Sequence, residues 1–157
     1  KFELRFRDLI QTDRDQIKET IIWNVESGQK LSGPDLSRAE MKRTRLYHRV
    51  RRFMETHEFL ILPVSQVPPF SIDQPYISEI NGQALDTYID WMKSCYYISA
   101  IGLPAISVPC GFTESGLPVG VQIVGRHSDD FGVLQIAHAF EQATQTWKHR
   151  PDVVNTE

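Results

Sequence analysis

The stretch GLPAISVPCGFTESGLPVGVQIVG, residues 102–125, constrains the fold more than any other part of the chain. It contains two apolar runs, AISVP and VGVQIVG, with the polar segment TESG between them. Short runs rich in Val and Ile are typical of strands, and a short connection between strands favours an antiparallel hairpin over a parallel crossover. We therefore expect two neighbouring antiparallel strands here.

Glycines and prolines mark the turns and edges of this hairpin. Gly102 gives a sharp entry before the first strand, and Gly116 suits the positive-φ position of a turn. Pro109 limits ladder pairing, so it indicates a strand end or edge. Gly120, inside a strand pattern, predicts a bulge or the close approach of another backbone.

Helical periodicity occurs in four other segments. A first helix should follow QTDRDQ, capped by Thr12 or Asp13, and end at Gly28. A second should follow LSGPD, bury Leu36, Leu46, Val50, Phe53 and Met54, and end near residues 56–58. A third should span about 84–100, and the last should begin near 128 or 129.

The run FLILPV, residues 59–64, is continuously apolar. This predicts a short strand buried on both faces of a sheet. The prolines that follow indicate a long loop over 65–83, and such loops often line binding sites. Helices that alternate with buried strands predict an α/β fold.

Composition sets limits on the class of protein. The chain has 157 residues, 41% hydrophobic and 24% charged, which is ordinary globular usage and argues against disorder or a fibrous fold. A net charge of −3 favours neither nucleic acid nor an acidic membrane surface as a partner. Two cysteines outside any C-x-x-C pattern favour a reduced, cytoplasmic protein. No apolar run is long enough for a membrane helix.

Catalytic and metal motifs are absent from the sequence. There is no G-x-S-x-G elbow, phosphate-binding G-x-x-x-x-G-K or H-E-x-x-H pair, and the five histidines are scattered. A Cys-His dyad using Cys95 or Cys110 stays open beside the simpler interpretation of buried apolar thiols. The large aromatic residues most suited to a pocket are Trp23, Phe70, Tyr76, Trp91, Tyr96 and Tyr97. Core packing is the simpler interpretation for each, but Phe70 and Tyr76 lie in the Pro-rich loop, where no helix or strand periodicity accounts for them.

The second helix carries a basic stripe at steps of three and four residues. Its members are Arg38, Lys42, Arg45, Arg49 and Arg52. A solvated face explains the stripe most simply, and docking of phosphate or an acidic partner is the alternative.

Longer patterns resemble a known family. AIGLPAISVPCGFTESGLPVGVQIVGR is similar, almost end to end, to the C-terminal part of the amidase signature family. FLILPVSQVPPF resembles the strand and Pro-rich loop of that family, and IIWNVESGQKLSGPDLSRAEMKRTRLYHRVRRFME resembles its preceding helices. DDFGVLQIAHAFEQAT is similar to its closing helix. The resemblance covers nearly the whole chain.

The resemblance implies an α/β/α fold around a mixed β-sheet flanked by helices. It implies amide hydrolysis by a Ser–cis-Ser–Lys triad, without metal or organic cofactor. The segment that carries both serines in the family has no counterpart here, since the chain contains no Ser-Ser pair. No triad residue is therefore assigned. Residues 1–157 are interpreted as one C-terminal segment, inactive alone, that completes the sheet and part of the funnel wall. The resemblance implies that the third helix and the Pro-rich loop form that wall. The substrate-binding candidates are Trp23, Phe70, Tyr76, Trp91, Met92 and Cys95.

Three functions remain open at this stage. The first is an amidase acting on a linear carboxamide; the others are a non-catalytic α/β scaffold and the A subunit of a tRNA-dependent glutamine amidotransferase. In such amidotransferases, a resembling helix offers an Asp to the α-amino group of the substrate, and our register places Met92 there, with Asp90 two residues earlier. Met92 at that position argues against free glutamine. The expected partners are a small amide and the N-terminal part of the protein, with a homodimer left open and neither membrane nor nucleic acid expected.

Overall fold

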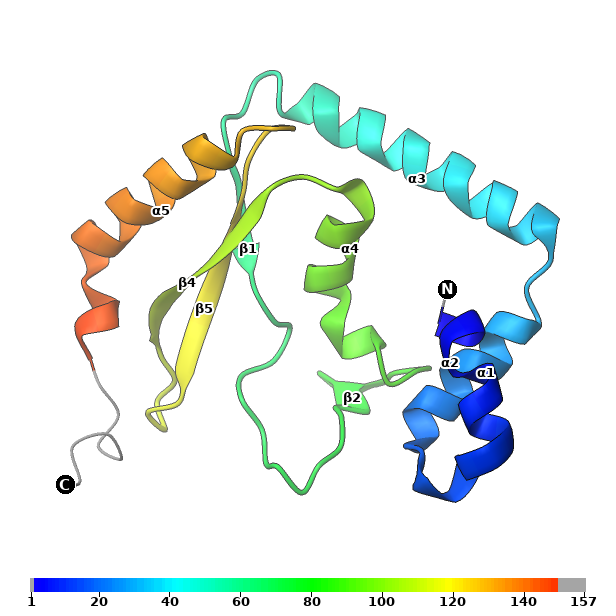
Figure 1. Cartoon of the computed structure of the whole chain (residues 1–157). Coiled ribbons are helices and arrows are strands. Elements are labelled where there is room, and N and C mark those ends of the chain that lie inside the picture. Colours follow the sequence, from blue (N-terminus) through cyan, green and yellow to red (C-terminus); the bar gives the residue numbers. More distant parts are fainter. Residues whose placement is uncertain (1, 150–157) are drawn as a thin grey trace. The chain divides into compact units, whose positions relative to one another are not determined.

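The computed structural model describes residues 2–149 and divides the chain into two compact units, residues 1–44 and 45–157. Figure 1 shows the helices and strands along the chain. The interpretation of the chain as one C-terminal segment stays a prediction.

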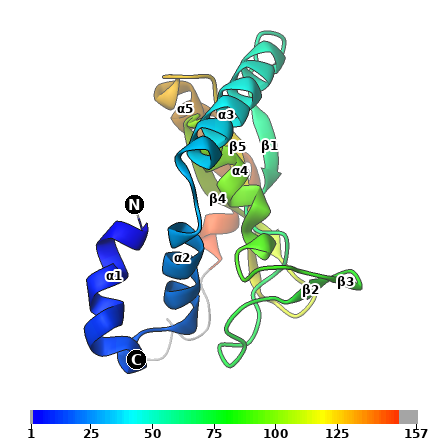
Figure 2. The same cartoon turned by 90° about the vertical axis from the view of Figure 1, so that its right-hand side faces the viewer.

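The first unit is built on a pair of helices, α1 (Phe2–Asp13) and α2 (Glu19–Gln29), which lie side by side (Figure 2). A 3₁₀ turn over Arg14–Gln16 joins them. The prediction that Thr12 or Asp13 caps the first helix is wrong. The Thr12 hydroxyl donates to backbone carbonyls one turn back inside α1, and α2 begins at Glu19 without a side-chain cap.

Helix α3 (Gly33–Phe53) begins after LSGPD as predicted. Its start is a reciprocal cap: the Asp35 amide donates to Ser32 Oγ, and the Ser32 amide donates to Asp35 Oδ2 at 2.9 Å. The helix ends at Phe53, earlier than expected. Met54 is buried, but Leu36 is 57% exposed and Phe53 42% exposed, so the expected burial of these two is wrong.

The second unit is organised around a three-stranded sheet in the order β1–β5–β4. Its strands are β1 (Leu60–Pro63), β4 (Ala105–Phe112) and β5 (Pro118–Val124), and the described pairings are antiparallel. The predicted hairpin is therefore confirmed. A register shift lies between Pro109 and Gly111, and Gly116 has the expected positive φ, 81°.

Helices cover both faces of this sheet. On one face, Val124 packs with Ile98 and Ile101 of α4 (Lys93–Ile101) and with the last turns of α3. On the other, Val108 and Ile123 pack with Ala137 of α5 (Asp130–Thr144), which Asp129 caps near the predicted start. A 3₁₀ turn, η3 (Thr146–Lys148), follows α5.

Strand β1 is an outer strand, and this overturns one expectation. FLILPV was expected to be buried on both faces, yet burial alternates along β1 and Ile61 is 54% exposed. Helix α5 packs mainly on β4 and β5, at the other side of the sheet from β1.

The segment expected to be a loop over 65–83 contains a small hairpin, β2 (Glu79–Ile80) and β3 (Gln83–Ala84). Asn81 and Gly82 both have positive φ, as a two-residue turn between such strands requires. The third helix also differs from the prediction. A 3₁₀ turn, η2 (Asp90–Met92), precedes α4, because the residues from 83 are used first in β3 and then in a Thr87–Asp90 turn. No described helix is both long and apolar enough to cross a membrane.

Candidate functional site

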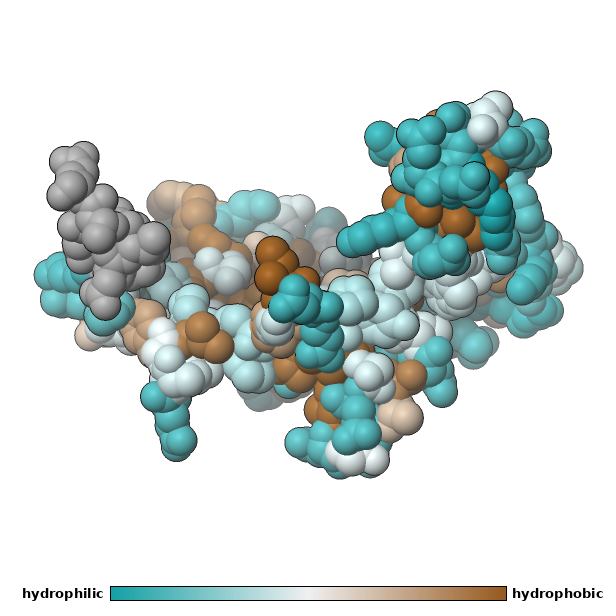
Figure 3. Space-filling model, turned by 90° about the horizontal axis from the view of Figure 1, so that it is seen from below, coloured by the Kyte–Doolittle hydropathy of each residue, from teal (hydrophilic) through white to brown (hydrophobic). Residues whose placement is uncertain are grey.

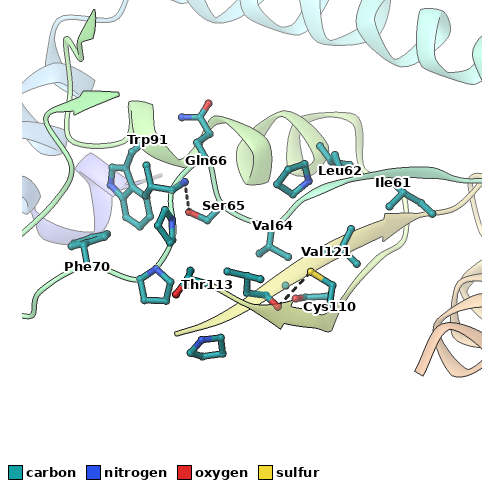
Figure 4. Close-up of a pocket in the computed structure, with 18 residues that line it drawn as sticks. Ile61, Leu62, Val64, Ser65, Gln66, Phe70, Trp91, Cys110, Thr113 and Val121 are labelled. Carbon is teal, nitrogen blue, oxygen red and sulfur yellow. Dashed lines mark hydrogen bonds between the residues drawn. The ribbon is translucent and has the colours of Figure 1, made fainter. Parts of the chain in front are cut away.

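A pocket of about 900 Å³ lies in the second unit. Its walls come from the end of β1, the Pro-rich segment that follows it, Trp91 of η2, and the ends of β4 and β5 (Figure 4). The segment over 65–78 has no helix or strand, so it can follow the pocket rather than a regular hydrogen-bond ladder. Seen from below, the molecule exposes apolar side chains, drawn brown in Figure 3, between polar ones.

Two aromatic rings form one wall of this pocket. Phe70 and Trp91 meet edge to face, with ring centroids 5.4 Å apart and planes at 88°. Gln66 Nε2 donates to the Asp90 carbonyl at 3.0 Å, so the Pro-rich segment is also tied to η2 through the backbone. Trp91 Nε1 is buried without a hydrogen-bond partner among the described residues.

The lining is uncharged. Among the described residues, 18 line the pocket, and none of them is Asp, Glu, Lys, Arg or His. Its polar side chains are Ser65, Gln66, Ser107, Cys110 and Thr113. A hydroxyl or thiol nucleophile needs an adjacent base, and these lining residues supply none. The pocket can therefore bind an apolar or neutral group, but its own described residues do not form a catalytic pair.

Local hydrogen bonds hold several of these polar groups. Cys110 Sγ donates to the Val119 carbonyl across the β4–β5 ladder at 3.5 Å. Ser65 Oγ accepts from the Val67 amide at 3.4 Å and so shapes the first turn of the Pro-rich segment. Both bonds are drawn in Figure 4. They set the pocket outline and leave the centre of the lining apolar.

Asp90 lies next to Trp91 in sequence, but its carboxylate belongs to a turn. It accepts from the Thr87 amide and hydroxyl, both at 2.8 Å, and pairs with Lys93 Nζ at 3.3 Å. These contacts, with the Thr87 hydroxyl as the largest cause, lower the pKa of the Asp90 carboxyl. The Asp90 carboxylate therefore interacts with groups at the start of α4, and Asp90 is not among the residues that line the pocket.

The predicted substrate residues separate in the structure. Phe70 and Trp91 line the pocket together. Tyr76 instead contacts Tyr88, with ring centroids 6.1 Å apart, and neither Met92 nor Cys95 is among the residues that line the pocket. Trp23 lies in α2 of the first unit and is 40% exposed. All six assignments stay predictions.

Sequence reasoning missed lining residues on the strands, such as Ser107, Cys110 and Val121. The signal for Cys110 was its place between Pro109 and Gly111, where the pairing of β4 with β5 shifts register. No comparable signal marks Ser107 or Val121.

The basic stripe of α3 is partly neutralised along the helix. Arg38 pairs with Asp35, and Arg43 and Arg51, which add to the basic charge of the helix, pair with glutamates one turn away. Exposed pairs of this kind are typical of a solvated helix face. Docking of an acidic partner stays a prediction. No cluster of three or more potential metal ligands is found among residues 2–149.

The family model described as Amidase matches residues 6–134. The chain belongs to the amidase family. The A subunit of the glutamyl-tRNA(Gln) amidotransferase of Thermodesulfovibrio yellowstonii is 35% identical over 117 residues, which are 73% of this chain and 22% of that protein. Its counterpart in Geobacillus thermodenitrificans is 38% identical over 114 residues, again 73% and 22%. The chain thus spans about a fifth of the length of these relatives.

Solved structures show the same fold. A bacterial aryl acylamidase of the amidase signature family superposes with a TM-score of 0.81 at 24% identity, over 95% of this chain and 34% of that one. The A subunit of the glutamyl-tRNA(Gln) amidotransferase from Thermotoga maritima gives a TM-score of 0.57 at 26% identity, over 89% and 26%. The amidase signature resemblance and the α/β fold class are therefore confirmed.

Proposed function

We propose that this chain forms the C-terminal sheet and one substrate wall of an amidase that hydrolyses a neutral carboxamide. The observation that carries the proposal is the uncharged pocket beside the family hairpin. In the reaction, a Ser hydroxyl attacks the amide carbonyl, the C–N bond breaks, and the amine or ammonia leaves with a proton. Water then hydrolyses the acyl-enzyme to the carboxylate and restores the hydroxyl.

We place the nucleophile and base of this reaction outside the present sequence. The family resemblance calls for two serines and a lysine in one constellation, and no Ser-Ser pair occurs in these 157 residues. The role left to this chain is to hold the substrate against the reacting groups. Positioning of this kind supplies several kcal/mol of an enzyme's rate acceleration, on the order of 7–11 kcal/mol in the best cases.

The lining also favours a substrate class. Free glutamine carries an ammonium and a carboxylate, and burial of either charge without a partner is costly. The described pocket wall offers no charged side chain, and Asp90 is held by Thr87 and Lys93. An aryl or aliphatic amide has no charged group to desolvate when it binds against such a wall. We therefore propose a neutral amide, with Phe70 and Trp91 against its apolar group.

The sequence relatives favour a second candidate, the A subunit of a glutamyl-tRNA(Gln) amidotransferase. For this candidate the exposed arginines of α3 are available to an anionic partner. A preference for glutamine over neutral amides would favour it. A full-length protein that turns over neither substrate would instead support the non-catalytic scaffold.

The test compares the full-length protein that contains this chain with the isolated 157 residues. We expect the full-length protein to release amine and carboxylate from a neutral anilide, and the isolated chain to release none. Turnover by a pure sample of the isolated chain, with its mass verified, would contradict the assignment of the catalytic groups.

The two free thiols of the chain, Cys95 and Cys110, support the cytoplasm as the proposed location.

A further inference from the structure

The chain leaves β1 at Val64, and three hydrogen bonds to β5 and α4 hold it there. The Val64 amide donates to the Gly120 carbonyl of β5 at 3.4 Å. The Val64 carbonyl accepts from Ser94 Oγ and from Cys95 Sγ of α4, each at 2.8 Å. Directly after Val64 the Pro-rich segment begins, and it carries Gln66 and Phe70 along the pocket (Figure 4).

Gln122 reinforces this junction from the middle strand. Its side chain is the buried polar one among the described residues, with 7% of the residue exposed. Its Nε2 donates to the Pro63 carbonyl at 3.1 Å and to the Ser94 carbonyl at 3.0 Å. Both amide hydrogens are thereby used, so the burial of this polar group is compensated. One side chain thus connects β5, the end of β1 and the first turn of α4.

Gly120 makes room for the same junction. A Cβ there would lie 3.3 Å from Val64 Cγ2 and 3.2 Å from Ser107 Oγ, tighter than ordinary contact. Gly120 and Gln122 are two residues apart on β5, so they face the same side of the sheet. The G-x-Q pattern of the hairpin therefore gives Val64 a place to pack and fixes its neighbours by hydrogen bonds.

We propose that Gln122 and Gly120 are positioning residues for the pocket. Together with Val64 and Ser94 they form a group of residues that we call the Val64 clamp. The Pro-rich segment contains no helix or strand, so the contacts that hold its start at Val64 fix its position. When the clamp is intact, Phe70 is held against Trp91; when it opens, the wall moves away from the substrate. The effect on turnover rests on the proposed amidase function, whereas the clamp itself does not.

The first experiment needs no activity and uses the full-length protein. Gln122→Met keeps an unbranched side chain of similar length and removes both donors. The alkylation rates of Cys95 and Cys110 are measured by peptide mapping. Because Cys95 Sγ donates to Val64, we expect its rate to rise about tenfold, with Cys110 changed less than about twofold. Equal rates in parent and variant, or an equal rise at both thiols, would overturn the clamp.

Val133→Ala is the matched control, since Val133 is a buried residue of α5 on the opposite face of the sheet. It should lower the melting midpoint and leave the alkylation rate of Cys95 unchanged. Cys95 is exposed, and its thiol is restrained by the hydrogen bond to Val64. An acceleration of Cys95 by Val133→Ala as large as that by Gln122→Met would show that lost stability alone releases the thiol from this bond, and would overturn the proposal.

The second experiment measures turnover of a neutral anilide by the same proteins. Gln122→Met should raise KM about tenfold with kcat changed less than about threefold, and Val133→Ala should change neither. An unchanged KM beside a faster Cys95 would contradict the positioning role. If the parent protein hydrolyses no amide, the proposed function fails, and the alkylation rates still decide the clamp.

Discussion

Phe70 and Trp91 lie 21 positions apart in sequence and meet edge to face, with their ring centroids 5.4 Å apart. This pair links the Pro-rich segment to the turn before α4 and forms the aromatic wall of an uncharged pocket. If this wall holds the substrate, its loss should weaken binding more than it slows the reaction.

We predict that Phe70→Ala raises KM for a neutral anilide about threefold to tenfold in the full-length protein, since an edge-to-face pair contributes about 0.5–1.5 kcal/mol beyond burial. Steady-state kinetics give the result. Phe131→Ala is the control, because Phe131 is an exposed aromatic residue at the start of α5, away from the lining. Equal changes in KM for both variants would argue against the aromatic wall.

Gly102 provides a prediction about stability. It ends α4 in the left-handed region, with φ 65° and ψ 31°. Gly102→Ala should lower the free energy of unfolding by about 1 kcal/mol, because a side chain is strained there. Gly33→Ala, at the first residue of α3, meets open space at ordinary φ and should cost nothing. Denaturant unfolding of both variants measures the difference, and equal midpoints would refute the assigned cap.

Gly125 is not in the left-handed region of the backbone, but it lies close to the Val133 side chain of α5. A Cβ there would lie 2.4 Å from Val133 Cγ2. We predict that Gly125→Ala destabilises the fold by about 1–3 kcal/mol, as overpacking does. Combination with Val133→Ala should recover part of that loss, which a double-mutant cycle measures as a coupling energy. Strict additivity would show that the two positions do not meet.

Asp90 predicts a dependence of stability on pH. Hydrogen bonds from Thr87, followed by the Lys93 charge, lower its folded-state pKa below the ordinary 3.8. A lowered folded pKa gives stability that is fully present above the unfolded value and is lost as the pH falls through the folded one. Asp90→Asn should therefore have a lower melting midpoint than the parent protein at neutral pH. The difference between the two midpoints should narrow below about pH 4.

Thermal melts across this pH range provide the measurement for Asp90. Asp86→Asn serves as the control, since it removes a nearby carboxylate and leaves the contacts of Asp90 with Thr87 and Lys93 in place. A difference in melting midpoint between Asp90→Asn and the parent that stays constant down to acidic pH would contradict the role given to the Asp90 charge.

Local pattern was enough to predict the hairpin over 102–125, because strand alternation, a short connection and Gly116 all agree. The small hairpin at 79–84 was missed although Asn81-Gly82 is a strong turn signal, since its strands have only two residues each. The exposure of Ile61 was not predictable from an apolar run. It depends on which strand a helix covers, and that is a property of the assembled sheet.

The sequence could not tell which of the candidate aromatic residues share a pocket. Aromatic residues in a Pro-rich segment indicated a wall, and Phe70 reached Trp91, while Tyr76 contacted Tyr88 instead. No periodicity tells which ring of an irregular segment turns inward. The role of Gln122 was also hidden, because its partners are backbone carbonyls of Pro63 and Ser94, distant in sequence.

The uncharged wall is proposed to select a neutral amide as the substrate. The most direct measurement is the ratio of kcat/KM for a neutral anilide to kcat/KM for free glutamine, determined with the full-length protein at neutral pH. We predict a ratio of at least about one hundred, because an unpaired charge would have to enter the pocket with glutamine. A ratio near one, or a preference for glutamine, would show that the uncharged wall does not select a neutral amide.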